Sequence, residues 1–377
     1  MKGLTAPSLS LTNRLPGARF DDVVIVIGGS NSVMREGWYR WFKIYARDRM
    51  DLHVINFSIG AASSLISVYR ILADDIRGRN VTIVWEYAIN EDVCVRHRGD
   101  IYSPAMVERN VARFLTLCAR RSIKVLPLLL PTQRMWKNED WRLTKVIETV
   151  FKRFGTKPFR YDRLLAKRVA DLPDTPIFLD TLHFEPGPIS KMIASSVLKR
   201  MHHAEVPVIP ADAPEDSLTW FVTADFQAGE PIRFKNRLFD THGYRPAKSR
   251  MLHPAPTRPA DLLGIILVSR IESHGFEMRL PSESLHFASA PLASRIPVQL
   301  KIFTLEAVRD RPIRLNPGET LEFSYSLEPD LLAPATFNPA PGTPEVPAAP
   351  LSTIAGLLWE TEATATDLMR ESVTQMS

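Results

Sequence analysis

The chain has 377 residues, of which 45% are hydrophobic and 24% are charged, a composition typical of folded globular proteins and not of disordered or fibrous ones. The length is sufficient for two domains that each bury a core. The net charge of +5 arises from 47 basic and 42 acidic residues, an excess too small to indicate a nucleic-acid partner, and no apolar run is long enough to span a membrane.

The N-terminal segment, residues 1–21, lacks the apolar block of a secretory signal, and we interpret it as a weakly ordered lead-in. Only Cys94 and Cys118 are present, too few for a disulfide framework or a thiolate metal site. If no upstream segment has been removed, these features predict a cytoplasmic protein in a reducing compartment.

Residues 22–204 alternate short apolar runs with helical patterns, which is typical of a parallel sheet covered by helices. The runs are rich in Val, Ile and Leu without strict alternation, as expected for strands buried on both faces. We therefore expect an α/β domain of the flavodoxin-like, three-layer kind with a five-stranded parallel sheet. The predicted strands are residues 22–28, 52–58, 81–87, 123–130 and 176–180.

Amphipathic patterns between these runs predict helices at 37–50, 104–121 and 187–201, and Ser103 before Pro104 provides a start signal for the second of them. A basic run at 151–168 has the composition of a solvated helix face, which we favour over a nucleic-acid surface.

The rest of the chain changes character after a proline-rich linker at 205–216. Residues 217–330 contain strand patterns, among them 319–329, where large apolar residues alternate with polar ones. We expect an antiparallel, β-sandwich-like domain here. Residues 331–377 are predicted to form a proline-rich strap and, within 351–371, a terminal amphipathic helix.

Small polar residues follow four of the predicted parallel strands. The sequences are GGSNS at 28–32, SIGAASS at 58–64, AINED at 88–92 and DTLH at 180–183. Ligands bind beyond the carboxyl ends of parallel strands, because loops and helix N-termini converge there. The sequence therefore predicts a site at this edge of the sheet.

In the first of these segments Gly28 and Gly29 allow a sharp turn that exposes the hydroxyl of Ser30 near a helix N-terminus, where backbone N–H groups can stabilise negative charge. Taken alone, GGSNS is more often a polar turn or a phosphate cradle than a nucleophile. It lacks the Gly-Lys-Ser/Thr of a P-loop.

In the last segment Asp180 and His183 are three residues apart, a spacing at which a carboxylate can hold the Nδ1 proton of an imidazole while Nε2 faces outward as a base. Asp-x-x-His alone is a weak signal, since either residue could cap the following helix. Its combination with Ser30 at the same sheet edge favours acyl-transfer chemistry.

The four segments, extended to NFSIGAASS, YAINED and DTLHFEP, resemble the motifs of the SGNH hydrolases, also called GDSL-type esterases and lipases, in the order that family requires. The resemblance covers residues 22 to about 203. It implies that Ser30 is the nucleophile, that His183 and Asp180 complete a triad, and that the oxyanion is held by the N–H groups of Ser30 and Gly60 and by the side-chain amide of Asn90.

Two positions depart from the family pattern. Gly29 stands where the family usually has an Asp that supports the turn, so the rigidity of the turn is open. Either Gly60 or Ala61 could fill the second motif's Gly position, and we prefer Gly60 because the required group is a backbone N–H.

The sequence thus predicts a serine esterase or acyltransferase that acts on small acyl esters, acetyl esters first, of a carbohydrate or polysaccharide. The alternative is a catalytically retired SGNH-fold binding or scaffold protein of polysaccharide biosynthesis. No residues have metal-ligand spacing and no dinucleotide motif is present, so we expect neither metal nor cofactor. The expected partner is a small-molecule or carbohydrate ester, without nucleic acid or a membrane span, and the oligomeric state is open.

Overall fold

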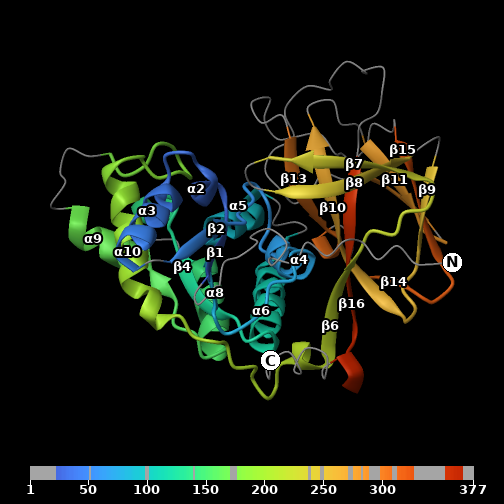
Figure 1. Ribbon diagram of the computed structural model, residues 1–377, viewed down its shortest axis with the longest axis horizontal. Coiled ribbons are helices and arrows are strands. Elements are labelled where there is room, and N and C mark those ends of the chain that lie inside the picture. The colour runs from blue at the N-terminus through green and yellow to red at the C-terminus, as the bar shows by residue number, and fades with distance from the viewer. Residues whose placement is uncertain are drawn as a thin grey trace.

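The computed structural model describes residues 23–50, 52–97, 102–138, 141–169, 176–236, 239–246, 250–270, 275–281, 283–287, 298–307, 312–326 and 353–367. The expected lead-in at 1–21 and the proline-rich strap at 331–350 lie outside these ranges. An α/β unit and a β unit lie side by side (Figure 1).

The α/β unit is built on a five-stranded parallel sheet with the strand order β2-β1-β3-β4-β5. The first and third strands are fully buried, which explains their continuous apolar sequences. The five-stranded, flavodoxin-like sheet is therefore confirmed. Its strands are β1 (Val23–Gly28), β2 (His53–Asn56), β3 (Val81–Glu86), β4 (Lys124–Leu129) and β5 (Phe159–Arg160).

The prediction of residues 176–180 as the fifth strand is wrong. The fifth strand is the short β5, which pairs with β4 through Leu128 and Phe159. Residues 177–185 instead fold back on themselves, with an antiparallel bridge between Phe178 and Phe184. The run is apolar because Phe178 packs against Phe184, whose ring lies 4.8 Å away, and not because it enters the sheet.

Helices cover both faces of the parallel sheet, as Figure 1 shows. One face packs against α3 (Trp38–Met50), α9 (Tyr161–Val169) and α10 (Pro188–Arg200), and the other against α4 (Leu65–Ala73), α6 (Pro104–Arg120) and α8 (Arg142–Arg153). Three further α-helices of this unit are α2 (Ser30–Val33), α5 (Ala88–His97) and α7 (Gln133–Asn138).

The start of α6 follows the predicted signal. Ser103 Oγ accepts a hydrogen bond of 3.3 Å from the N–H of Met106, and Pro104 occupies the first helical position, where its missing N–H costs nothing.

The β unit is a sandwich of two antiparallel sheets, as the sequence predicted. A seven-stranded sheet has the order β13-β10-β16-β8-β7, with β14 paired to β10 and β6 paired to β16, and a four-stranded sheet has the order β12-β11-β15-β9. The strands are β6 (Leu218–Thr223), β7 (Gly229–Lys235), β8 (Asp240–Pro246), β9 (Arg250–Pro254), β10 (Ala260–Arg270), β11 (Gly275–Arg279), β12 (Ser284–Phe287), β13 (Val298–Thr304), β14 (Ile313–Leu315), β15 (Thr320–Ser326) and β16 (Thr353–Glu362).

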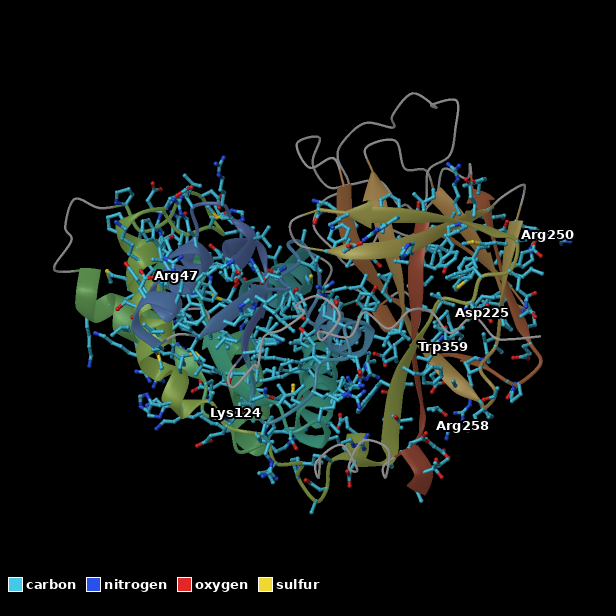
Figure 2. All side chains as sticks on the ribbon, in the orientation of Figure 1. Arg47, Lys124, Asp225, Arg250, Arg258 and Trp359 are labelled. Atoms are coloured by element: carbon cyan, nitrogen blue, oxygen red, sulfur yellow. The ribbon has the colours of Figure 1, made fainter. Side chains whose placement is uncertain are left out.

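The expected terminal helix within 351–371 is wrong, because residues 353–362 form the strand β16 in the middle of the seven-stranded sheet. Leu357 and Trp359 point into the core shared with the four-stranded sheet, and Trp359 lies inside the β unit in Figure 2. Ala355 and Leu358 face the other way, into a core shared with the α/β unit. A strand buried on both faces lacks alternation, so its apolar residues also satisfy a helical stripe.

The two units therefore share one continuous core. Helices α4 and α6 lie between the parallel sheet and the seven-stranded sheet (Figure 1), and Tyr69 and Phe114 belong to the same apolar cluster as Leu358. Ser63 Oγ, in the loop after β2, lies 3.1 Å from Thr304 Oγ1 at the end of β13.

An ion cluster is buried within this interface. Arg113 of α6 is 4% exposed and donates hydrogen bonds to two carboxylates of the β unit, at 2.7 and 3.1 Å to Glu306 and at 2.8 and 3.1 Å to Glu360. Trp220 Nε1 adds a bond of 2.7 Å to Glu360. Burial alone would raise the pKa of Glu306, but the bonds and charge of Arg113 hold it below its ordinary value.

The predicted linker runs along the α/β unit before β6 begins. Glu205 forms an isolated antiparallel backbone bridge with Val125 of β4, and the N–H of Val208 donates a hydrogen bond of 2.9 Å to the carbonyl of Phe154. We propose the segment 205–216 as the boundary between the domains. Within the described ranges, no helix combines the length and the apolar character needed to cross a membrane.

Candidate active site

Ser30 lies where the buried strand β1 turns sharply into the short helix α2. Gly28 ends the strand, and the carbonyl of Gly29 accepts a hydrogen bond from the N–H of Ser32 at 3.1 Å. Ser30 is the first residue of α2, so its hydroxyl stands at the carboxyl edge of the parallel sheet.

His183 and Asp180 reach the same edge from the loop that folds back before α10. His183 Nε2 lies 2.7 Å from Ser30 Oγ, and His183 Nδ1 lies 2.7 Å from Asp180 Oδ2. With the Nδ1 proton donated to Asp180, Nε2 is the acceptor for the hydroxyl of Ser30. A carboxylate, an imidazole and a hydroxyl thus form one hydrogen-bonded chain.

The loop also fixes the charge state of Asp180. Partial burial alone would raise its pKa, but the N–H of Leu182 and the ring and N–H of His183 donate to the carboxylate, and together they hold the pKa below its ordinary value. The two backbone bonds to Oδ1 are both 2.8 Å long. Asp180 is therefore an ionised partner for the imidazole at neutral pH.

Gly60 and Asn90 border Ser30 from the loops after β2 and β3. A methyl group built on Gly60 would lie 3.5 Å from Cα and Cβ of Ser30, so the Gly60 backbone packs directly against the serine. Ala61 adopts the left-handed region at φ 53°. Asn90 is 2% exposed in the first turn of α5, and its Nδ2 donates to the carbonyl of Ala62 at 2.9 Å. The five residues chosen from the sequence thus gather in one place.

The structure gives a steric reason for Gly29. A Cβ at this position would overlap Oδ1 of Asn90, so an Asp of the usual family pattern does not fit unless Asn90 moves. The neighbouring Gly28 is also confined, since a Cβ there would lie 2.7 Å from Ser32 Oγ. The glycine pair follows from the crowding of this turn.

A different carboxyl group supports the turn from the end of β3. Glu86 is 1% exposed, and its Oε2 accepts hydrogen bonds from Ser32 Oγ at 2.8 Å and from the N–H of Gly29 at 3.3 Å. Burial raises the pKa of Glu86 to about 8, although both bonds oppose the change. Glu86 therefore lies behind the turn as a neutral carboxyl group and does not face a substrate. From the sequence alone, a contact between Glu86 and the substrate was possible.

The pH dependence of stability tests this assignment. The ordinary pKa of Glu86 is 4.5 and the folded value is about 8, so between these values the unfolded chain releases a proton that the folded chain keeps, and stability falls as pH rises. Glu86→Gln removes this titration and keeps an acceptor for Ser32. We expect its free energy of unfolding, relative to the wild type, to rise by about 1 kcal/mol per pH unit between roughly pH 5 and 8, measured by urea denaturation. A difference independent of pH would contradict the raised pKa.

Asn31 was not selected from the sequence, yet it ties the two halves of the site together. Its side chain is 3% exposed, with Nδ2 donating to the carbonyl of Leu182 and Oδ1 accepting from the N–H of Phe184, both at 2.9 Å. Asn31, which follows Ser30 in the chain, therefore hydrogen-bonds to the backbone on both sides of His183. An Asn in a polar turn is too common to have signalled this.

Two acidic residues near these loops have partners of their own. Glu91 is fully buried, burial raises its pKa, and its carboxylate accepts from the N–H of Ser64. Asp92 pairs with Arg96 on α5, and Arg35 is exposed. Within the described ranges, no cluster of three or more His, Cys, Asp or Glu side chains could hold a metal ion.

Comparison with known proteins identifies the fold. No family model matches the chain, and no curated protein matches it. A two-domain esterase active on acetylated mannans superposes with a TM-score of 0.58 at 10% sequence identity, over 91% of this chain and 92% of that chain.

Two further solved structures match about half of this chain. An acetyl xylan esterase covers 48% of this chain and 99% of its own length at 14% identity and a TM-score of 0.42. A lipase/acylhydrolase from Enterococcus faecalis covers 49% and 98% at 13% identity and a TM-score of 0.37. At these identities the likeness concerns the fold alone, and the structure with a TM-score of 0.58 shares the two-domain fold of this chain.

Proposed function

We propose that this chain, which shares its two-domain fold with a solved esterase, is a serine hydrolase of the SGNH/GDSL type that cleaves small acyl esters, acetyl esters first, of a carbohydrate or polysaccharide. The observation that carries the proposal is the chain of two 2.7 Å contacts from Asp180 through His183 to Ser30. Such a chain activates a hydroxyl that is otherwise a weak nucleophile at neutral pH.

The reaction proceeds in two halves. Ser30 Oγ attacks the ester carbonyl while His183 Nε2 takes the hydroxyl proton, and Asp180 stabilises the imidazolium that forms. Collapse of the tetrahedral intermediate breaks the bond to the sugar oxygen, which leaves with the proton of His183. A water molecule then attacks the acyl-serine, again with His183 as base, and releases the carboxylic acid.

Three donors are available for the oxyanion: the N–H of Ser30, the N–H of Gly60 and Nδ2 of Asn90. Neither backbone N–H donates a hydrogen bond within the described part of the chain. Nδ2 of Asn90 uses one proton for Ala62 and has a second to give. Each donor of this kind lowers the barrier by about 3 kcal/mol.

The choice of a carbohydrate substrate is supported by the second domain. The two-domain likeness to an esterase active on acetylated mannans extends through the sandwich, so the proposal includes an O-acetylated polysaccharide as the substrate class. Replacement of water by a sugar hydroxyl in the second half would make the same site an acyltransferase.

The alternative is a catalytically retired binding or scaffold protein on this fold. It was motivated by Gly29, which the crowding by Asn90 now accounts for in steric terms. A fluorophosphonate probe separates the two functions, because a live Ser30 becomes covalently labelled and a retired one does not.

The direct test of the proposal is turnover of 4-nitrophenyl acetate by the purified protein. We expect release of acetate that depends on Ser30. Absence of both turnover and fluorophosphonate labelling would favour the binding protein.

Asn31 provides a test of how the site is held together. Asn31→Ala removes both bonds to the His183 loop, so we expect kcat to fall by about tenfold to a hundredfold with KM nearly unchanged, because the reacting geometry loosens while the substrate contacts remain. Asn31→Asp keeps the acceptor for Phe184 and loses the donor to Leu182, so it should retain more activity. Equal KM and kcat in the wild type and Asn31→Ala would contradict the positioning role.

A further inference from the structure

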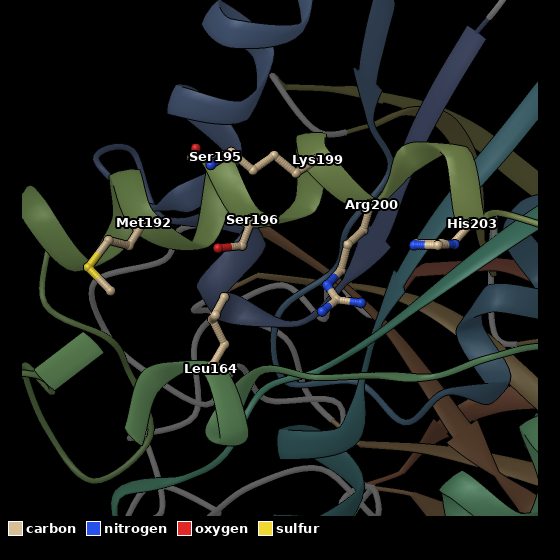
Figure 3. A pocket seen from close by; sticks show the side chains of 7 residues that line it. All are labelled: Leu164, Met192, Ser195, Ser196, Lys199, Arg200 and His203. Carbon is tan, nitrogen blue, oxygen red and sulfur yellow. The ribbon is translucent and has the colours of Figure 1, made fainter. Parts of the chain in front are cut away.

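Two adjoining cavities lie between α9 and α10, away from the loops that carry Ser30. The first, of about 310 Å³, is drawn in Figure 3, and the second, of about 370 Å³, continues past Pro158 and Phe159 beside β5. They share Leu164 and Arg200, whose side chains point toward each other across the gap between the two helices. We call the two cavities together the α9/α10 groove.

The groove gathers positive charge. Seven lysines and arginines line it and only one carboxylate, that of Glu148. The lining therefore carries at least as much positive charge as the whole chain, whose net charge is +5. The basic residues of the lining are Lys152, Lys157, Arg160, Arg163, Lys167, Lys199 and Arg200.

Most of this charge is not neutralised from within the described part of the chain. Glu148 pairs with Lys152 at 3.1 Å and with Arg160 at 3.4 Å, and Arg160 is also paired with Asp162 at 2.6 Å. No ion pair with an acidic group of the described residues forms at the other five basic residues of the lining. The pKa of His203 at one end is held below its ordinary value by desolvation and by the neighbouring charges of His202, Arg200 and Lys157, which together outweigh the opposing charge of Glu205.

Arg200 is positioned to receive an anion. Its guanidinium lies 4.2 Å from the ring centre of Phe159, a contact that orients the planar fork without using its hydrogen-bond donors. Ser195 and Ser196 of α10 add hydroxyl groups to the lining of the first cavity, and Leu164 of α9 adds an apolar side chain. Oriented guanidinium, ammonium and hydroxyl groups match a ligand that carries both carboxylates and hydroxyls.

We propose that the α9/α10 groove binds a carboxylate-bearing polysaccharide. It would thereby hold the protein on an acidic glycan whose esters are cleaved at the Ser30 site. The identity of the ligand rests on the proposed function. Helix α10 begins just after His183 and reaches Arg200 about 18 Å further along, at 1.5 Å per residue, so a single extended chain can serve both places.

A nucleic acid fits the groove less well. Single-stranded nucleic acids bind by stacking bases on exposed aromatic rings, but Phe159 is 4% exposed and lies against Arg200. A duplex needs roughly 1,000 Å² or more of protein surface, which two small cavities between helices do not offer.

Binding is measured on the Ser30→Ala protein, so that cleavage does not interfere, with fluorescently labelled polygalacturonate as the probe. Replacement of both Arg163 and Lys199 by Ala is expected to weaken binding by about tenfold at low salt, and added sodium chloride should weaken binding of the parent protein. A matched pair, Lys43→Ala with Arg314→Ala, removes two exposed charges outside the groove and should change the affinity by less than about twofold.

Equal affinities of the two double variants would overturn the proposal, and so would equal binding of polygalacturonate and neutral mannan. Tighter binding of a single-stranded oligonucleotide than of polygalacturonate would overturn the choice of a polysaccharide. Turnover of 4-nitrophenyl acetate by the Arg163/Lys199 variant with Ser30 intact is measured separately. This small ester tests the Ser30 site and does not test the groove, so the variant should turn it over like the wild type. Absence of turnover in the wild type itself would count against the esterase and not against the groove.

Discussion

Replacement of Ser30 by Ala is expected to lower kcat for 4-nitrophenyl acetate by at least about 10⁴-fold, because the attacking oxygen is gone while the oxyanion donors remain. His183→Ala should cause a loss of similar size, since Ser30 Oγ then has no base within the 2.7 Å that His183 Nε2 provides. The double variant should be no worse than either single one, because the two groups act as a unit.

The controls separate chemistry from folding. Ser217→Ala removes an exposed serine outside the site, whose hydroxyl donates a hydrogen bond to the carbonyl of Pro214, and should leave turnover and fluorophosphonate labelling of Ser30 intact. Circular dichroism should be the same for all variants. Unchanged turnover in Ser30→Ala would refute the esterase, and additive losses in the double variant would show that Ser30 and His183 act separately.

Arg113→Met is expected to produce the largest loss of stability, about 3–5 kcal/mol in the free energy of unfolding. The substitution keeps an unbranched side chain on α6 but removes the cation that Glu306 and Glu360 share, and leaves Glu306 only the exposed Arg109 at 3.7 Å. Urea denaturation followed by tryptophan fluorescence measures the loss, and Trp220, which bonds to Glu360, is one of the seven tryptophans that contribute to the signal. The loss should shrink as pH falls, because unpaired buried carboxylates have raised pKa values and protonation relieves them.

Arg109 on the same helix is the matched control. It is 45% exposed and lies 3.7 Å from Glu306, so Arg109→Met should cost no more than about 1 kcal/mol. Combining Arg113→Met with Glu306→Gln and Glu360→Gln should recover much of the lost stability. If Arg113→Met were as stable as Arg109→Met, the cluster would not hold the domains together.

The sequence predicted the sheet edge of the site well, for a physical reason. Buried parallel strands such as β1 and β3 have continuous apolar sequences, so their ends, and the polar residues after them, can be located from the sequence alone. Because carboxyl ends of parallel strands share an edge, Ser30 and Asn90 were expected to be neighbours. Their catalytic roles stay predictions.

What the sequence could not predict depends on the directions of side chains across distant segments. Asn31 bonds to the His183 loop across 151 or more positions of sequence, and Glu86 bonds to the turn across 54 or more. Neither an Asn in a polar turn nor a Glu at a strand end is unusual. The secondary structure of segment 176–180 and of β16 was predicted wrongly. An apolar run indicates that a segment is buried but does not indicate which element it packs against.

The place of β16 has a consequence for biosynthesis. This strand lies between β10 and β8 at the centre of its sheet, although it is the last strand of the described chain to be translated. The sandwich, and the shared core that joins it to α4 and α6, therefore cannot close until residue 362 has left the ribosome, whereas every strand of the parallel sheet is complete some two hundred residues earlier. Nascent chains stalled before β16 should expose the apolar faces of β10 and α4 to chaperones and proteases.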